Sequence, residues 1–260
     1  LFMARDPMRK KPLHYAMLAD GAFVFGSELK SLLPYPGMVR EIDPLAIEEY
    51  LAFGYIPDPR SIYKSILKLP AAHRLLWRRG DAAPTIDAYW DVKFADVADT
   101  REASAKELMA QLREAVDLRM IADVPLGAFL SGGVDSSCVV ALMAGLSQTP
   151  VKTFSMGFAD KAFDETSYAQ QMATRYHTDH HSRIVDPDSI DLVDRMIDFY
   201  DEPFGDSSAM PTFRLCALAR ENVTVALSGD GGDELFAGYR RYLFHARQEQ
   251  MRAWLPLALR

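Results

Sequence analysis

Short apolar runs alternate with longer stretches of helical periodicity over the second half of the chain. Apolar runs of this kind predict strands buried on both faces, and apolar positions three or four residues apart predict amphipathic helices. Repeated strand–helix units build a mostly parallel sheet with helices on both faces, so we predict a doubly wound α/β domain. The predicted strands are residues 126–130, 151–155, 182–185 and 223–227, and the predicted helices are residues 103–121, 134–146, 165–177, 187–200 and 211–220. In the helix over residues 187–200, we expect a buried stripe of Ile190, Val193, Ile197 and Tyr200.

The first ninety residues have a different pattern, with short apolar runs separated by turn residues. Asp43 and Pro44 have the residue types of a helix N-cap and first helical position, so a helix is expected to begin there. This part is predicted to be α+β, and a polar, acidic linker follows it. The other expected elements are strands over residues 1–4, 14–18, 22–25 and 75–77, and a short helix over residues 27–33.

Composition limits the possible classes of function. The formal net charge of −7 argues against a nucleic-acid-binding protein, whose surface would be basic. No segment has the length of a transmembrane helix, so we expect no membrane partner. The two cysteines, Cys138 and Cys216, lie in apolar helical patterns, and we predict buried thiols and a cytoplasmic location. The chain starts at Leu1 and stops within a helical pattern, so we expect a piece of a longer protein.

A glycine-rich turn lies between the first predicted strand of the α/β part and the helix after it. Residues 131–137 read Ser-Gly-Gly-Val-Asp-Ser-Ser. The glycines allow a sharp turn, and the free N–H groups at the helix start favour an anion such as phosphate. Ser131, Ser136 and Ser137 can add hydroxyl donors, and Asp135 can hold Mg²⁺. The alternative is a plain strand-to-helix turn capped by serine and aspartate. The common P-loop motif is absent from the sequence.

A second glycine-rich loop follows the last predicted strand, at residues 228–234, Ser-Gly-Asp-Gly-Gly-Asp-Glu, and a helix is expected over residues 235–240. Ligands of doubly wound sheets bind beyond the carboxyl ends of the strands, so two such loops on adjacent strands are expected to face one site. Asp135 and Asp233 are then candidates to share one Mg²⁺ on a bound triphosphate. Asp230 and Glu234 would lie near an amine or cation of a second substrate. A calcium-binding loop is the alternative, but the EF-hand spacing is not met.

Both loops resemble known motifs. Residues 131–136 are similar to the SGGxDS signature of the ATP pyrophosphatase fold, and residues 228–239 resemble the SGxGxDExFxGY segment of the glutamine-hydrolysing asparagine synthetases. The resemblance covers nearly the whole chain. It implies the closing portion of an Ntn-type glutaminase domain at residues 1–90, a linker at 91–102 and an incomplete ATP-binding synthetase domain at 103–260. Residues 5–13, 26–30, 153–158, 163–165 and 201–204 also resemble this family.

The resemblance implies a ligase of asparagine biosynthesis that forms an acyl-adenylate from a carboxylic acid and ATP, releases pyrophosphate, and amidates the acid with glutamine-derived ammonia. Aspartate is the first choice of acid, and a homodimer is one option for the assembly. Asp230 stands where the family usually has a glutamate, one methylene longer. The implied sites are Leu130, Ser131, Gly132, Gly133, Asp135, Ser136, Met156, Ser228 and Gly229 for ATP, Asp135 and Asp233 for Mg²⁺, and Asp230 and Glu234 for catalysis.

Other features of the family fall outside the chain or differ from it. The nucleophilic cysteine of the family's glutaminase would lie upstream of Leu1. A lysine of its synthetase would lie beyond Arg260. Arg9 stands where the family commonly has a glycine, so an altered turn is expected there. Two alternatives stay open: a related enzyme that acts on another acid, in β-lactam, sugar or peptide amidation, and an ATP-binding module without catalysis.

Overall fold

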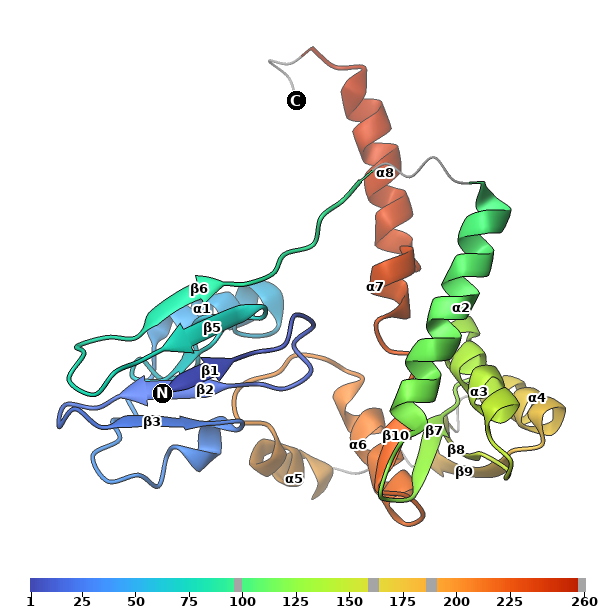
Figure 1. Cartoon of the computed structure of the whole chain (residues 1–260), viewed down its shortest axis with the longest axis horizontal. Helices are drawn as coiled ribbons and strands as arrows, with labels where there is room; N and C mark the ends of the chain where they lie inside the picture. Colours follow the sequence, from blue (N-terminus) through green and yellow to red (C-terminus); the bar gives the residue numbers. More distant parts are fainter. Residues whose placement is uncertain (96–99, 159–163, 186–190, 257–260) are drawn as a thin grey trace. The chain divides into compact units, whose positions relative to one another are not determined.

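The computed structural model describes residues 1–95, 100–158, 164–185 and 191–256 (Figure 1). Its contacts divide the chain into two compact units. The first unit comprises Leu1–Ala98 and Ser189–Met210, and the second comprises Asp99–Asp188 and Pro211–Arg260. Among the described residues, no helix has the length and apolar character needed to span a lipid bilayer.

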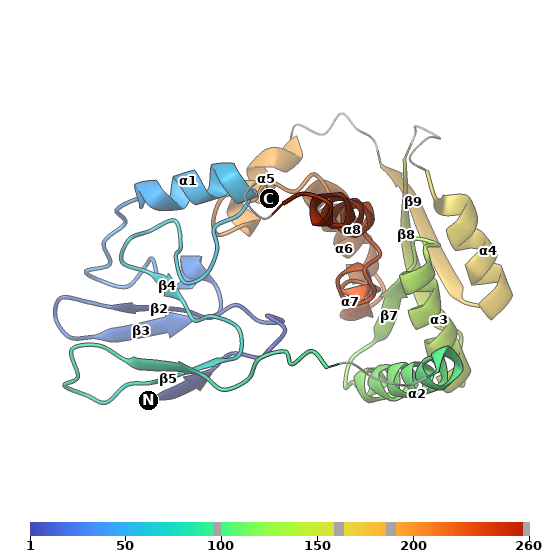
Figure 2. The same ribbon diagram turned by 90° about the horizontal axis from the view of Figure 1, so that it is seen from above.

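The first unit contains two small antiparallel sheets, with strand orders β1-β5-β6 (Figure 1) and β3-β2-β4 (Figure 2). Met3 and Leu75 from one sheet and Tyr15 from the other share a buried apolar core. The elements of this unit are β1 (Phe2–Ala4), β2 (His14–Met17), β3 (Phe23–Gly26), the 3₁₀ turn η1 (Leu29–Ser31), α1 (Pro44–Phe53), β4 (Leu67–Lys68), β5 (His73–Leu76), β6 (Thr85–Ala88) and α5 (Asp191–Phe199). Asp43 caps α1 by accepting a hydrogen bond from the Leu45 N–H at 3.1 Å, as its sequence position predicted.

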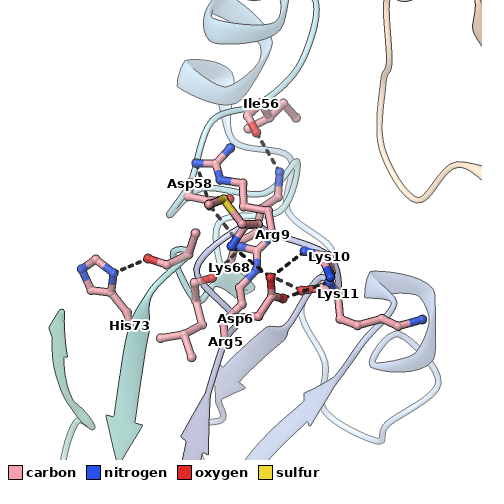
Figure 3. Close-up of polar contacts among 12 residues, drawn as sticks. Arg5, Asp6, Arg9, Lys10, Lys11, Ile56, Asp58, Lys68 and His73 are labelled. Carbon is pink, nitrogen blue, oxygen red and sulfur yellow. Dashed lines mark hydrogen bonds and ion pairs between the residues drawn. The ribbon is translucent and has the colours of Figure 1, made fainter. Parts of the chain in front are cut away.

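The polar turn after β1 contains Arg9, at the position where the family commonly has a glycine. The Asp6 carboxylate accepts hydrogen bonds from the backbone N–H groups of Met8, Lys10 and Lys11, which lowers the pKa of Asp6 (Figure 3). Arg9 has a φ of 57°, in the left-handed region that favours glycine. Its guanidinium lies 3.1 Å from the buried Asp58 carboxylate, which also pairs with Arg5. The turn therefore holds an arginine in a glycine-type conformation, beside a buried carboxylate.

The second unit is built on a parallel four-stranded sheet of order β10-β7-β8-β9. One apolar cluster joins the sheet to α2, α3 and α4 and includes Val116, Val140 and Ala169. Phe154, on the opposite side of its strand from Thr153 and Ser155, packs on Leu218 of α6. This unit contains α2 (Arg101–Met120), β7 (Leu126–Phe129), α3 (Val134–Leu146), β8 (Lys152–Phe158), α4 (Thr166–Tyr176), β9 (Asp179–Val185), α6 (Ala209–Arg220) from Pro211 on, β10 (Val225–Leu227), α7 (Gly232–Phe236) and α8 (Arg240–Ala253).

The expected stripe of α5 is wrong. Val193, Ile197 and Tyr200 are 46%, 67% and 38% exposed, whereas Leu192 is buried, and Ile190 lies outside the described residues. The reason is that α5 belongs by its contacts to the first unit. Its stripe therefore does not pack on the parallel sheet of the second unit.

Other local predictions also need correction. The helix expected over residues 27–33 is only the short turn η1, closed by i to i+3 hydrogen bonds. The helix expected over residues 235–240 is interrupted, because Ala237 is left-handed and ends α7, and α8 begins at Arg240. Cys216 is exposed, since α6 buries Leu218 and Ala219 instead, and Cys138 is only partly buried.

Residues 201–205 follow α5 and are held by polar contacts within the first unit. Asp201 accepts a 2.6 Å hydrogen bond from the Leu29 N–H. The Glu202 carboxylate pairs with the Lys68 ammonium, and both side chains are largely buried, at 18% and 11% exposure. Glu202 also accepts a hydrogen bond from the Ile62 N–H at 3.2 Å. These contacts explain why this segment clusters with residues far from it in sequence.

We expect Glu202→Ala to destabilise the first unit by about 3 kcal/mol, because it leaves the buried Lys68 ammonium without its carboxylate. Burial raises the pKa of Glu202 more than Lys68 lowers it, so the cost of burying the charge offsets part of the attraction between the pair. We therefore expect a loss of stability at the low end of the values for buried ion pairs. The measurement is urea denaturation read by hydrogen exchange of first-unit amides. The matched control is Glu41→Ala, which breaks the exposed pair with Lys64 and should have no measurable effect. Equal effects of the two variants would contradict the prediction.

Candidate functional site

The first glycine-rich loop leaves the carboxyl end of β7 and leads directly into α3. Within the loop, Ser136 Oγ lies 2.9 Å from Ser131 Oγ, and Ser131 Oγ accepts a hydrogen bond from the Gly133 N–H at 3.2 Å. The hydroxyls of Ser131 and Ser136 therefore brace the turn as well as lining it. Gly132 has a φ of 86° and lies against α4, where an added Cβ would be 2.5 Å from Tyr168 Cβ. Glycine is required there by backbone conformation and by packing.

The second loop leaves β10, which pairs in parallel with β7, so both loops start at neighbouring strand ends. They are in close contact. A Cβ on Gly229 would lie 2.6 Å from the Ser136 backbone nitrogen, and a Cβ on Gly232 would lie 2.5 Å from the Asp135 carboxylate. The topology predicted that the loops would face one site, and the structure confirms this placement. The glycines of the second loop let its backbone approach the first loop.

The two loops border one cavity of about 1000 Å³ in the second unit. Gly132 faces α4 instead of the cavity, and Ser137, expected as a hydroxyl donor, is buried and is not among the described residues that line it. All other residues predicted for the site line the cavity. These are Leu130, Ser131, Gly133, Asp135, Ser136, Met156, Ser228, Gly229, Asp230, Asp233 and Glu234.

The cavity also has lining residues that the sequence did not assign to the site. Glu165 and Thr166 come from the start of α4, and Thr212 comes from α6. Asp164 supports this wall without lining it, because its carboxylate accepts hydrogen bonds from the Thr166 hydroxyl and N–H, which lowers its pKa. Glu165 lies in residues 163–165, which resemble the family, so the sequence did contain a signal for assigning it to the site. Thr212 carries no local signal, since only the fold brings α6 to this cavity.

The cavity wall is strongly acidic. Five carboxylates line it, from Asp135, Glu165, Asp230, Asp233 and Glu234, and no lysine, arginine or histidine is among the described lining residues. A polyphosphate cannot approach such a wall without cations, because like charges repel in a partly dehydrated site. Backbone N–H groups of the first loop and a bound metal ion are the available sources of positive potential.

Asp135 and Asp233 have the chemistry that Mg²⁺ requires. Both residues line the cavity, one from each loop. The described residues contain no group of three or more His, Cys, Asp or Glu side chains placed to hold a metal ion. Mg²⁺ commonly uses one or two protein carboxylates together with water and substrate phosphates. The residues therefore fit an ion that binds with a nucleotide, in preference to a cage made of protein ligands alone.

Two hydrogen bonds hold two of the three acidic side chains of the second loop. The Ser228 hydroxyl donates to Asp230 at 2.9 Å, and the Tyr239 hydroxyl donates to Glu234 at 2.7 Å. The latter bond lowers the pKa of Glu234 and raises the pKa of Tyr239 to about 12. Glu234 is therefore kept ionised at neutral pH, and both carboxylates have defined orientations at the cavity.

Comparison with known proteins extends over the whole chain. The family model for asparagine synthase matches residues 107–260, and that for a glutamine amidotransferase domain matches residues 1–90. A putative glutamine-hydrolysing asparagine synthetase of Methanocaldococcus jannaschii is 40% identical, with 100% of this chain and 51% of that protein covered. Asparagine synthetase 1 of Bacillus subtilis is 33% identical, with 93% of this chain and 38% of that protein covered. An amidase of Penicillium rubens, chyE, is 28% identical over 100% of this chain and 41% of its own length.

The chain thus spans about half, or less, of the length of these relatives. The asparagine synthase model alone matches more than half of the chain, and it includes both glycine-rich loops and the cavity that they border. The chain belongs to the asparagine synthase family.

Proposed function

We propose that the full-length protein is an ATP-dependent, AMP-forming amide ligase that activates a carboxylic acid, with aspartate as the first candidate. One observation carries the proposal: two glycine-rich loops from adjacent parallel strands meet at one cavity, and each contributes an aspartate to its lining. A cavity at the carboxyl ends of parallel strands is the usual place for a nucleotide. Membership of the asparagine synthase family supports the choice of reaction.

In the proposed reaction, a carboxylate oxygen of the acid attacks the α-phosphorus of ATP, and the bond to the β-phosphate breaks. The first loop and the N–H groups at the start of α3 hold the leaving pyrophosphate as its charge develops. Asp135 and Asp233 would hold Mg²⁺, which supplies charge neutralisation at the phosphates. Ammonia then attacks the acyl carbon, AMP leaves with the bonding electrons, and a proton is lost to give the amide.

The second loop is proposed to orient the acid and the amine. Asp230 keeps the charge of the glutamate usual at this position, and Ser228 restrains its shorter side chain. Glu234, ionised and held by Tyr239, would receive a positively charged group of the acid substrate. Both assignments rest on the position of these side chains at the cavity wall.

We assign the two parts of the chain by the same reasoning. Residues 1–90 are proposed as the closing portion of an Ntn-type glutaminase domain that supplies ammonia from glutamine, supported by the match to a glutamine amidotransferase domain. Residues 103–260 are proposed as an ATP pyrophosphatase-type domain, although Ser189–Met210 within this range belong by their contacts to the first unit. The proposed linker before it is residues 91–102, of which Arg101 and Glu102 already belong to α2. A cytoplasmic location, where ATP is available, fits this proposal, and a homodimer is the proposed assembly.

The test is ATP–pyrophosphate exchange by the full-length protein with Mg²⁺ and a panel of acids. We expect exchange that requires both Mg²⁺ and an acid, with aspartate supporting the fastest rate. Exchange with another acid alone would identify a related ligase with a different substrate. ATP binding without exchange for any acid would contradict the proposed reaction and favour a non-catalytic module.

A further inference from the structure

An acid substrate meets an electrostatic problem in this cavity. The described lining residues provide five carboxylates and no basic side chain. Mg²⁺ would compensate for the phosphates, but a second, non-reacting carboxylate on the acid would still face a wall of its own sign. Such a group needs a cation near the part of the wall formed by the second loop and the residues after it.

Arg241 provides a cation beside that part of the wall. Its guanidinium carbon lies 4.2 Å from the ring centroid of Tyr239 and 5.9 Å from that of Tyr242. Tyr239 lines the cavity and donates its hydroxyl hydrogen bond to Glu234. Resting on the proposed function, we infer that Arg241 is a specificity-determining residue that binds the non-reacting carboxylate of a dicarboxylic acid substrate.

The position of the guanidinium against the ring of Tyr239 suits this role. Contact with the face of a ring uses none of the guanidinium N–H donors, so they stay available to bind a carboxylate in a bidentate manner. Among the described residues, no carboxylate lies within ion-pair distance of Arg241, and its guanidinium lies near the two rings.

The position favours the acid over the phosphates of ATP. The phosphates are assigned to the first loop and to the start of α3. Arg241 instead follows the second loop, on the side where Asp230 and Glu234 are proposed to orient the acid. A substrate with one carboxylate at Arg241 and an ammonium group at Glu234 would have its remaining carboxyl free to react.

The experiment compares Arg241→Gln with Arg240→Gln in the full-length protein. Arg240 is the neighbouring exposed arginine at the first position of α8 and makes no such ring contact among the described residues. Exchange is measured with aspartate and with 3-aminopropanoate, which keeps the amine and the reacting carboxyl but lacks the second carboxylate. We expect Arg241→Gln to raise the KM for aspartate about 10- to 100-fold and to reduce the preference for aspartate by a similar factor. The KM for ATP should stay unchanged, and Arg240→Gln should resemble the wild type.

Three results would overturn the inference: an unchanged aspartate preference in Arg241→Gln, a raised KM for ATP with no effect on the acid, or an equal loss with both acids. Arg241→Lys serves as a second variant. It keeps the charge and loses the planar fork, so an intermediate loss of preference is expected. If the wild type shows no exchange with any acid, the proposed function fails and the inference fails with it. If the wild type discriminates and both Arg241 variants discriminate equally well, only the inference fails.

Discussion

Asp135→Asn should reduce ATP–pyrophosphate exchange by the full-length protein at least about 100-fold, and Asp233→Asn should do the same. The two side chains come from different loops and line one cavity, so each is proposed as a ligand of the same Mg²⁺. Asparagine keeps the size of aspartate and removes its charge. The loss therefore reports on charge at the metal and phosphates, with little change in packing.

Titration of ATP in the presence and absence of Mg²⁺ separates a metal-binding role from a general defect. The wild type should bind ATP more tightly with Mg²⁺, and the Asp135→Asn and Asp233→Asn variants should lose most of this difference. Asp117→Asn, an exposed position on α2 away from the described cavity lining, is the control and should behave as the wild type. Variants that keep both exchange and the Mg²⁺ effect would disprove the magnesium assignment.

The adjacency of the two loops could be predicted from sequence because each loop is a local signal. Glycines between an apolar run and a helical pattern predict a strand–turn–helix unit, and parallel strands place such turns at the same edge of a sheet. The pairing of β10 with β7 is what brings Gly229 onto Ser136 and Gly232 onto Asp135. The two-loop site could therefore be predicted, because it depends only on local sequence and on this one rule of topology.

Features that depend on contacts distant in sequence were missed. Glu202 pairs with Lys68 across 134 residues, and nothing near either position in the sequence indicates the partner. The apolar stripe of α5 predicted burial against the sheet, but the segment after it is held by the first unit, and the stripe stays exposed. Hydrophobic periodicity shows that a helix has an apolar face, but it does not say which unit of the protein that face meets.

The roles of individual arginines also lay beyond the sequence. Arg240 and Arg241 are adjacent and chemically identical, so the sequence alone does not distinguish their roles. The structure separates them, because of these two described residues Arg241 alone lies over the ring of Tyr239. At Arg9, the sequence suggested an altered turn, but the structure shows how an arginine is accommodated, with a left-handed backbone and an ion pair to Asp58.

Gly229→Ala should reduce ATP–pyrophosphate exchange by at least about 100-fold. A displacement of the reacting groups by about 1 Å is enough for a loss of this size. The added Cβ would lie 2.6 Å from the Ser136 nitrogen and 2.8 Å from the Asp135 carbonyl carbon. Both are backbone atoms at the start of α3, so they cannot turn aside as a flexible side chain would. One loop must move away from the other, and Asp135 and Asp233 would then be displaced from the positions proposed for binding one Mg²⁺. Overpacking of this kind should also cost about 1–3 kcal/mol of stability, measurable by thermal unfolding.

Gly231→Ala is the matched control, two residues away in the same loop. No atom lies within 4 Å of the position its Cβ would take, but its φ is 92°, so alanine would be strained there. We expect a loss of about 1–2 kcal/mol in stability from the left-handed backbone. Gly231 also lines the cavity, but its Cβ would meet no atom of the first loop, so we expect a much smaller loss of activity than in Gly229→Ala. Gly229→Ala should thus lose far more activity than Gly231→Ala at a similar cost in stability. Equal activities of the two variants would show that the close contact between the loops is not needed to hold the nucleotide, and the two-loop site would have to be abandoned.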